Sequence, residues 1–183
     1  HVRREFQMFH ALAAFSLILT ATLVTASEPV VFPKSTIDIG MVVTDLDASV
    51  SFYTDGIGFR ELEGFQVDST LAGSAGLTDN KPLDVRVLVL GNDKTATKLK
   101  LMQIARTSPR SGDNDFIHSH TGFRYLTIII EDTSVALSRL KKIGVTPLAK
   151  SPVTLPQNLA PGMSLTCIKD PDGNLVELIG PTP

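Results

Sequence analysis

A carboxylate within an apolar run is the first residue of chemical interest in this sequence. Residues 170–180 read DPDGNLVELIG, and the first four are typical of a tight turn. In the strand expected after this turn, alternation places Leu175, Glu177 and Ile179 on one face. A charge at that position is unfavourable unless it faces a partner or a wet cavity. Glu177 is therefore expected to face a partner or a cavity, or alternatively to be a solvent-facing residue of an edge strand.

Further candidates lie in a polar stretch between residues 105 and 124. His118 and His120 would point the same way on an extended chain, so they could bind a substrate or join a metal site. Arg106 and Arg124 could attract an anionic substrate to the mouth of a cavity. Exposed loop histidines and a solvated arginine are the simpler alternatives for this stretch.

Composition narrows the function classes. The chain has 183 residues, 43% hydrophobic and 20% charged, which suits one domain or two small halves. A net charge of −2 gives no basic surface, so nucleic acid is not expected as a partner. The single cysteine, Cys167, excludes an internal disulfide, and its apolar neighbours predict a buried, inert thiol.

The N-terminal 26 residues have the layout of a signal peptide. Arg3 and Arg4 precede an apolar stretch at residues 11–24, and small residues follow at the expected cleavage point. We therefore expect an exported protein, periplasmic or secreted, with no stable membrane association after cleavage. Residues 27–35, which contain two prolines, are expected to form a tether.

Hydrophobic periodicity predicts the same order of elements twice. In each half a strand, a helix and three strands follow one another. Aligning Asp45 with Asp132, the expected helix starts, gives an offset of 87 residues that places Asp38 on Tyr125. The predicted modules are residues 36–104 and 122–183, joined by a linker or lid at 105–121. The strands are expected at 37–43, 59–67, 83–90 and 98–104, and then at 125–130, 145–149, 164–168 and 174–179, with a helical turn or loop at 68–77.

The two ends of this repeat resemble a known family. Residues 37–59 resemble the opening, and residues 170–180 the close, of modules in the vicinal oxygen chelate superfamily, which includes glyoxalase I, bleomycin-resistance proteins and extradiol dioxygenases. The resemblance implies an α+β fold with two βαβββ modules packed as a cupped, barrel-like mixed sheet around a central cavity. It also implies that metal-dependent members carry one ligand on the first and one on the last strand of each module.

Carried over by position, the four ligand places of the superfamily fall on Asp38, Lys100, Tyr125 and Glu177, and only Glu177 matches. A protonated lysine cannot bind a divalent cation, so we expect no metal, with a divalent metal as the alternative. We expect Lys100 beside Glu177 and Asp38 beside Tyr125. In an enzyme, Lys100 would act as electrophile or base and Glu177 and Tyr125 would handle protons, with Asp38 as a further candidate catalytic residue.

Two function classes follow from the resemblance. One is a glyoxalase-like or bleomycin-resistance-like protein that acts on or binds a small molecule between the modules without the usual metal. The other is a metal-dependent lyase or isomerase, similar to lactoylglutathione lyase, or a ring-cleaving dioxygenase. A homodimer stays open as an alternative to a monomer.

Overall fold

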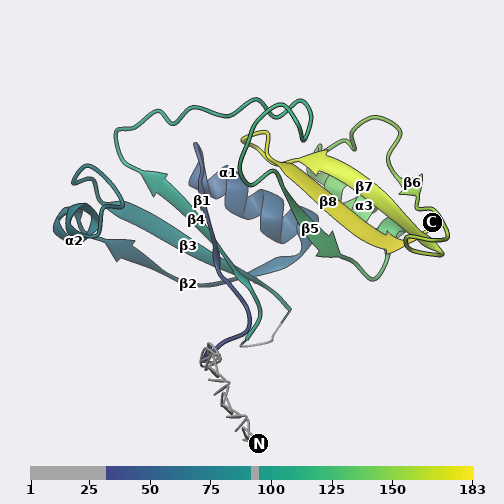
Figure 1. The fold of residues 1–183 in the computed structure, drawn as a ribbon, viewed down its shortest axis with the longest axis horizontal. Helices are drawn as coiled ribbons and strands as arrows, with labels where there is room; N and C mark the ends of the chain where they lie inside the picture. The colour runs from purple at the N-terminus through teal and green to yellow at the C-terminus, as the bar shows by residue number, and fades with distance from the viewer. Residues whose placement is uncertain (1–31, 92–94) are drawn as a thin grey trace, which may run out of the picture. The chain divides into compact units, whose positions relative to one another are not determined.

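The computed structural model describes residues 32–91 and 95–183, and its strands form two four-stranded mixed sheets (Figure 1). The strand orders are β1-β4-β3-β2 and β5-β8-β7-β6, with the first and last strand of each half parallel. The first half contains β1 (Ile39–Val42), α1 (Leu46–Ser51), a π-helical segment (Phe52–Ile57), β2 (Phe59–Val67), α2 (Ser69–Ser74), β3 (Leu83–Leu90) and β4 (Lys98–Ile104). The second half contains β5 (Tyr125–Ile129), α3 (Thr133–Lys142), β6 (Val153–Thr154), β7 (Met163–Lys169) and β8 (Leu175–Pro181).

The helices of both halves begin as the sequence predicts. The Asp45 carboxylate accepts a hydrogen bond from the Ala48 backbone N–H at 3.0 Å, and the Asp132 carboxylate accepts one from the Val135 backbone N–H at 2.9 Å. Each aspartate satisfies a donor that the first turn leaves unpaired. The predicted repeat is confirmed at these equivalent positions.

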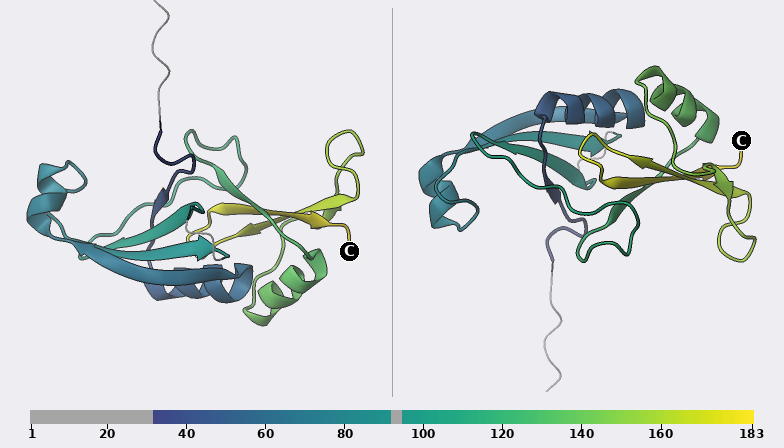
Figure 2. Two further views of the ribbon diagram at one scale, coloured as in Figure 1. Left: turned by 90° about the horizontal axis from the view of Figure 1, so that it is seen from below. Right: turned by 90° about the horizontal axis from the view of Figure 1, so that it is seen from above.

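Both α1 and α3 lie on one side of the sheets, which we call the helix side (Figure 2). The main core lies here and includes Tyr53, Leu101, Leu140 and Leu178, each no more than 1% exposed. The opposite face, which we call the open side, carries the long connection from residue 105 to residue 124 (Figure 2). The two sheets are cupped and do not close into a barrel, so the α+β, two-module expectation is confirmed in this open form.

The turn at residues 170–173 joins the two halves. The Tyr53 hydroxyl, fully buried, donates to the Asp170 carboxylate at 3.0 Å, and Asp170 itself is only 5% exposed. The Thr44 hydroxyl, just after β1, donates to the Asp172 carboxylate at 2.5 Å. Burial is the main reason that the pKa of Asp170 is raised, and burial next to Asp170 raises the pKa of Tyr53. The segment that closes the second half thus also holds the first half in place.

One predicted strand is wrong. Residues 145–149 form no strand, and a two-residue strand, β6, lies later, at Val153–Thr154. Pro147 has no N–H for a strand ladder, and Ala149 adopts φ +50°, which an extended strand does not allow. Only one backbone bond, from the Leu148 N–H to the Cys167 carbonyl at 2.8 Å, ties this segment to β7.

Two further expectations concern segments outside the strands. For residues 68–77 a helical turn or a loop was expected, and the structure has the short helix α2 there. The Asp68 carboxylate caps this helix by accepting a hydrogen bond from the Leu71 N–H at 2.9 Å. The predicted signal peptide lies outside the described residues. Within residues 32–91 and 95–183, no helix has the length and apolar character needed to cross a bilayer.

Candidate functional site

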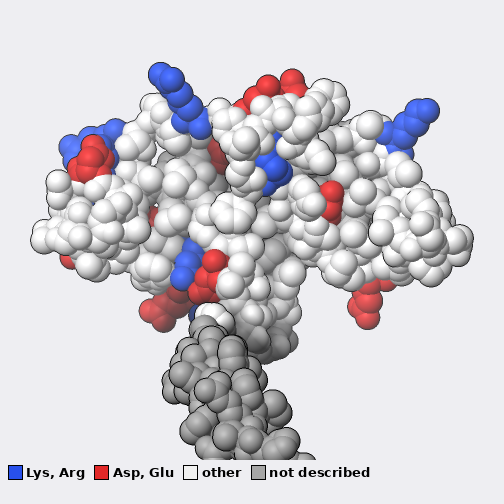
Figure 3. All heavy atoms as spheres, viewed as in Figure 1, with Lys and Arg blue, Asp and Glu red and all other residues white. Residues whose placement is uncertain are grey.

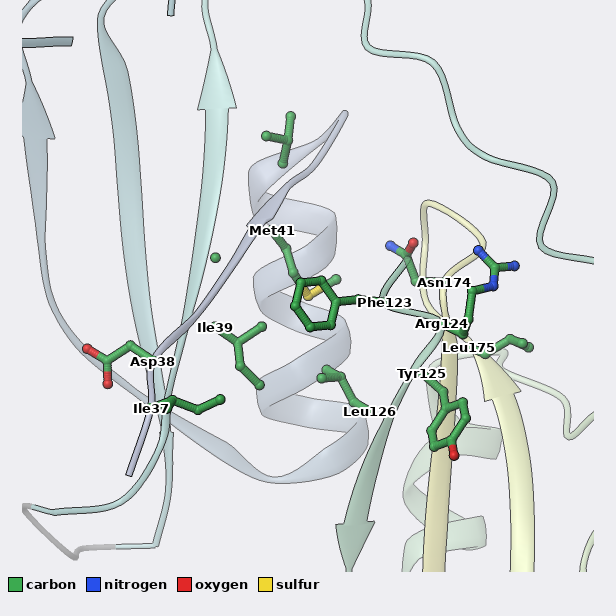
Figure 4. A pocket seen from close by; sticks show the side chains of 12 residues that line it. Ile37, Asp38, Ile39, Met41, Phe123, Arg124, Tyr125, Leu126, Asn174 and Leu175 are labelled. Carbon is green, nitrogen blue, oxygen red and sulfur yellow. The ribbon is translucent and has the colours of Figure 1, made fainter. Parts of the chain in front are cut away.

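A cavity of about 450 Å³ lies between β1 and β5, at the seam of the two sheets (Figure 4). This volume is in the range of small-molecule sites. Most of its lining is apolar, from residues on both sides of the seam. The apolar members are Ile37, Ile39, Met41, Val42, Phe123, Leu126 and Leu175. The polar members are Asp38, Arg124, Tyr125 and Asn174, and Gly40 completes the lining.

Two aromatic residues of the second half stand at this cavity with exposed rings. Phe123 is completely exposed, and Figure 4 shows its ring between β5 and Met41 of β1. Tyr125 is half exposed. A fully exposed phenylalanine gains nothing from folding, because its ring stays in water. Burial in the core therefore does not account for its place at the cavity mouth.

Asp38 lies at the first-half end of the cavity between two lysines. Its carboxylate is 2.8 Å from the Lys34 ammonium and 3.1 Å from the Lys100 ammonium. The hydrogen bond from Lys34, and next the one from Lys100, lower the pKa of Asp38 to about 2. Asp38 is therefore a carboxylate at all physiological pH values and is a poor proton donor.

The strand register gives Lys100 and Glu177 equivalent places in the two sheets. Lys100 is paired with Gly40 on β1, and Glu177 is paired with Thr127 on β5. Thr127 follows Gly40 by 87 residues, which is the offset between the two halves. However, the expected Lys100–Glu177 ion pair is wrong. Within residues 32–91 and 95–183, Lys100 pairs only with Asp38, and Glu177 instead accepts a hydrogen bond from the Thr127 hydroxyl at 2.8 Å.

The other expected neighbours, Asp38 and Tyr125, line the same cavity from opposite sides. Their functional groups do not meet in it. In Figure 4 the Asp38 carboxylate points away from β5, and the Tyr125 ring lies beside β5. The four positions therefore lie in pairs, each pair within one sheet.

Comparison with known proteins places this architecture. Residues 37–178 match the family model described as Glyoxalase/Bleomycin resistance protein/Dioxygenase superfamily. This chain belongs to that superfamily. None of the curated proteins matches it.

Solved structures of the superfamily share the fold at low sequence identity. A glyoxalase family protein from Bacillus cereus is similar with a TM-score of 0.69 at 18% identity, over 86% of this chain and 100% of that chain. Glyoxalase I from Zea mays gives a TM-score of 0.57 at 20% identity, over 80% of this chain and 46% of that chain. A glyoxylase/bleomycin resistance protein/dioxygenase domain from Frankia sp. EAN1pec gives 0.55 at 18% identity, over 79% and 95%.

The four positions that correspond to superfamily metal ligands make a poor donor set here. Asp38 already shares its charge with two ammonium groups, and Lys100 brings a positive charge to a place where a cation would sit. Glu177 and the Tyr125 phenol remain, which is fewer than the three or four ligands of a typical site. In the described part of the chain, no three His, Cys, Asp or Glu side chains are grouped suitably for a metal ion. These residues do not fit a divalent metal.

Arg124 organises the connection between the halves. Its guanidinium donates to the backbone carbonyls of Asp113 at 2.8 Å, Ile117 at 3.1 Å and Phe116 at 3.3 Å. The predicted substrate-binding arginine thus uses its donors to hold the loop that precedes β5, although it also lines the cavity. Its charge has no carboxylate partner within residues 32–91 and 95–183.

The remaining predicted substrate-binding residues lie outside the cavity lining. His118 stacks on Phe116 with ring centroids 5.5 Å apart, and His120 lies next to Gly112 in the same connection. Arg106 is exposed, in the turn two residues after the end of β4. Cys167 is half-buried on β7, opposite Glu177 in the ladder, and burial followed by the charge of Glu177 raises the pKa of its thiol. A raised pKa agrees with an inert thiol.

Three residues near this site were not singled out from the sequence. Lys34 follows Pro33 in the expected tether, and only its spacing of four residues from Asp38 could have indicated a contact. Phe123 is a lone aromatic residue in a polar stretch, which is a weak sign of a ligand contact. Asn174, at the start of a predicted strand, carries no sequence mark of a site residue, yet its side-chain amide donates to the Asp170 carboxylate at 2.9 Å and it lines the cavity.

Replacing Arg124 with methionine is expected to make the segment 113–117 several-fold more sensitive to limited proteolysis. The substitution removes three hydrogen bonds to loop carbonyls, while the methylene stem keeps most of its volume. Arg106→Met is the matched control, because no hydrogen bond of its guanidinium is found within the described ranges. Equal cleavage of both variants and wild type would show that Arg124 does not hold the connection.

Proposed function

We propose that this chain binds a small, largely apolar molecule in the cavity between β1 and β5, and that it does so without a metal. The observation that carries the proposal is the apolar cavity itself, with the exposed ring of Phe123 at its mouth. Binding sites for small molecules combine an apolar lining with a few polar groups, and this cavity has that composition.

The same cavity supports binding better than proton-transfer catalysis. The residues that a metal-free enzyme of the superfamily would use do not converge. The Lys100 ammonium is held by Asp38, and Glu177 is held by Thr127. A general base must lie within hydrogen-bond reach of the proton that it removes. We therefore propose a role as a binding protein for this chain.

The test uses an indole placed at the cavity mouth. The chain contains no tryptophan, so Phe123→Trp introduces a unique fluorophore with little change in shape. Titration with 1-octanol should shift its emission to shorter wavelength in a saturable way, because the ligand displaces water from the ring. Phe65→Trp, at a 46% exposed position of β2 outside the cavity lining, is the control and should not respond.

Two results would contradict the proposal. One is no saturable response of Phe123→Trp, and the other is an equal response of both variants, which would indicate non-specific adsorption. An independent measurement is mass spectrometry of small molecules retained by the purified wild-type protein, which would identify the ligand class directly. Phe123→Ala should reduce the retention of that ligand.

A further inference from the structure

We infer that the ligand of this cavity carries an anionic group in addition to its apolar body, and that this group binds at Lys34 and Lys100. The inference rests on the proposed function and adds the chemical class of the ligand. The expected ligands are small amphipathic monoanions, such as an aliphatic or aromatic carboxylate.

The charge at the end of β1 is not balanced. One carboxylate, that of Asp38, lies between the ammonium groups of Lys34 and Lys100, so the three groups together carry one excess positive charge. The side chains of Lys34 and Lys100 are 38% and 33% exposed. Each ammonium has three donors, and the bond to Asp38 uses one of them. Both lysines can therefore receive a second anionic acceptor without leaving Asp38.

The strand register adds further positive charge on the open side of the first sheet. Leu99 and Leu101 are buried in the core on the helix side, so Lys98 and Lys100 lie on the open side. Lys98 is paired with Val89, and Val89 is paired with Arg60. Directly paired residues share a face, so Arg60 also lies on the open side.

No acidic side chain of β1–β4 that has a register partner shares this face. Glu61 is directed to the helix side, where it pairs with Arg86, and Asp84 alternates with the buried, open-side Val85. Asp38 is thus the one carboxylate that contacts within the described ranges place beside Lys34 and Lys100, while Lys98 and Arg60 share the open side without an acidic partner in those ranges. Figure 3 shows basic and acidic groups side by side below the centre of a face that otherwise is mostly uncharged.

One residue of this charged group, Asp38, also lines the apolar cavity. It lies just before β1, and in Figure 4 its carboxylate points away from β5. The ammonium groups of Lys34 and Lys100 lie 2.8 and 3.1 Å from that carboxylate. Across the seam, Arg124 contributes another cation to the lining without a carboxylate partner in the described ranges. A ligand with its apolar body in the seam would therefore place a terminal anion within a positive field.

The test compares three probes of one chain length in the Phe123→Trp background: octanoate, 1-octanol and octylamine. Octanoate should bind about 5-fold more tightly than 1-octanol, the ratio given by an ion pair at the upper end of the exposed range. Octylamine should bind most weakly. Lys100→Met should abolish the advantage of octanoate, and Lys34→Met should reduce it. Lys141→Met, on α3 and distant from this face, is the control and should preserve it.

Asp38→Asn provides a test in the opposite direction. It removes the carboxylate that competes for both ammonium groups, so octanoate should bind more tightly while 1-octanol is unaffected. A gain of affinity cannot arise from a misfolded variant. Equal affinity for octanoate and 1-octanol, or no gain in Asp38→Asn, would overturn the inference and leave the proposed function intact. If none of the three probes binds, both are overturned.

Discussion

Asp170→Ala is expected to lower the free energy of unfolding by about 3 kcal/mol or more, one of the two largest effects that we expect from a single substitution. The Asp170 carboxylate accepts hydrogen bonds from the Tyr53 hydroxyl at 3.0 Å, the Asp172 N–H at 3.0 Å, and the Asn174 N–H and side-chain amide at 2.8 and 2.9 Å. Alanine leaves the fully buried Tyr53 hydroxyl without an acceptor. It also frees the turn that connects the second half to the first.

The matched control for this prediction is Tyr53→Phe. It removes one donor and leaves Asp170 with its three other bonds, so we expect a loss of only about 1 kcal/mol. Urea unfolding at neutral pH measures both values. A loss below that of Tyr53→Phe would show that the turn does not join the halves.

The pH dependence of Asp170→Ala gives a second readout. Because burial raises the pKa of Asp170, the folded protein holds this proton more tightly than the unfolded chain does. Protonation of Asp170 therefore stabilises the folded protein. This contribution is fully present below a pH of about 3.9, the pKa of Asp170 in the unfolded chain, and is lost as the pH rises through its pKa in the folded protein. Asp170→Ala should lack this dependence, and the difference in stability between wild type and variant should therefore change with pH in that window.

Gly64→Ala is expected to destabilise the protein by about 2–3 kcal/mol, at the upper end of what overpacking costs. Gly64 lies in the β-bulge of β2, between Leu62, paired with Val87, and Phe65, paired with Val85. A Cβ at this position would overlap the backbone carbonyl oxygen of Val85. Strand β3 is paired on both sides, with β2 and β4, so the Val85 carbonyl cannot move aside and the bulge or the ladder must distort.

Gly40→Ala is the matched control, because it is the same substitution in a strand of the same sheet. The added Cβ would meet only the terminal methyl carbon of Met102, at 3.0 Å, and this flexible end can rotate away. We expect a change within about 0.5 kcal/mol, since alanine also reduces the entropy of the unfolded chain. Equal stability of the two variants in urea unfolding would show that the bulge is not sterically constrained.

The sequence determined the local part of this structure, because local patterns depend on neighbouring residues alone. Alternation placed Glu177 on the face of β8 opposite Val176 and Leu178, and the structure agrees. The equivalence of Asp45 and Asp132 followed from the spacing of the repeat, and both cap helices. The strand predicted at 145–149 was wrong because an apolar run contained a proline, and the missing N–H outweighed the hydrophobic pattern.

The tertiary structure decided which partner each charged group has. Lys100 and Glu177 occupy equivalent places, as the superfamily resemblance implied, but each is held within its own sheet. Lys100 lies beside Asp38 because β1 is the parallel neighbour of β4, and Glu177 bonds to Thr127 because β5 is the neighbour of β8. Ion pairs form between the groups that lie closest in space, and sequence spacing does not encode distances across strands.

The tertiary structure likewise decided which groups Arg124 contacts in the connection between the two halves. The sequence predicted Arg124 as a substrate-binding residue. It could not predict the actual hydrogen-bond acceptors, because an arginine before a strand has no neighbouring residues that indicate its partner. In the folded chain three backbone carbonyls of the preceding loop lie within its reach and accept hydrogen bonds from its guanidinium. The resemblance of residues 37–59 and 170–180 to the superfamily implied a small-molecule protein. The site of the cavity, between β1 and β5, depends on how two similar halves meet.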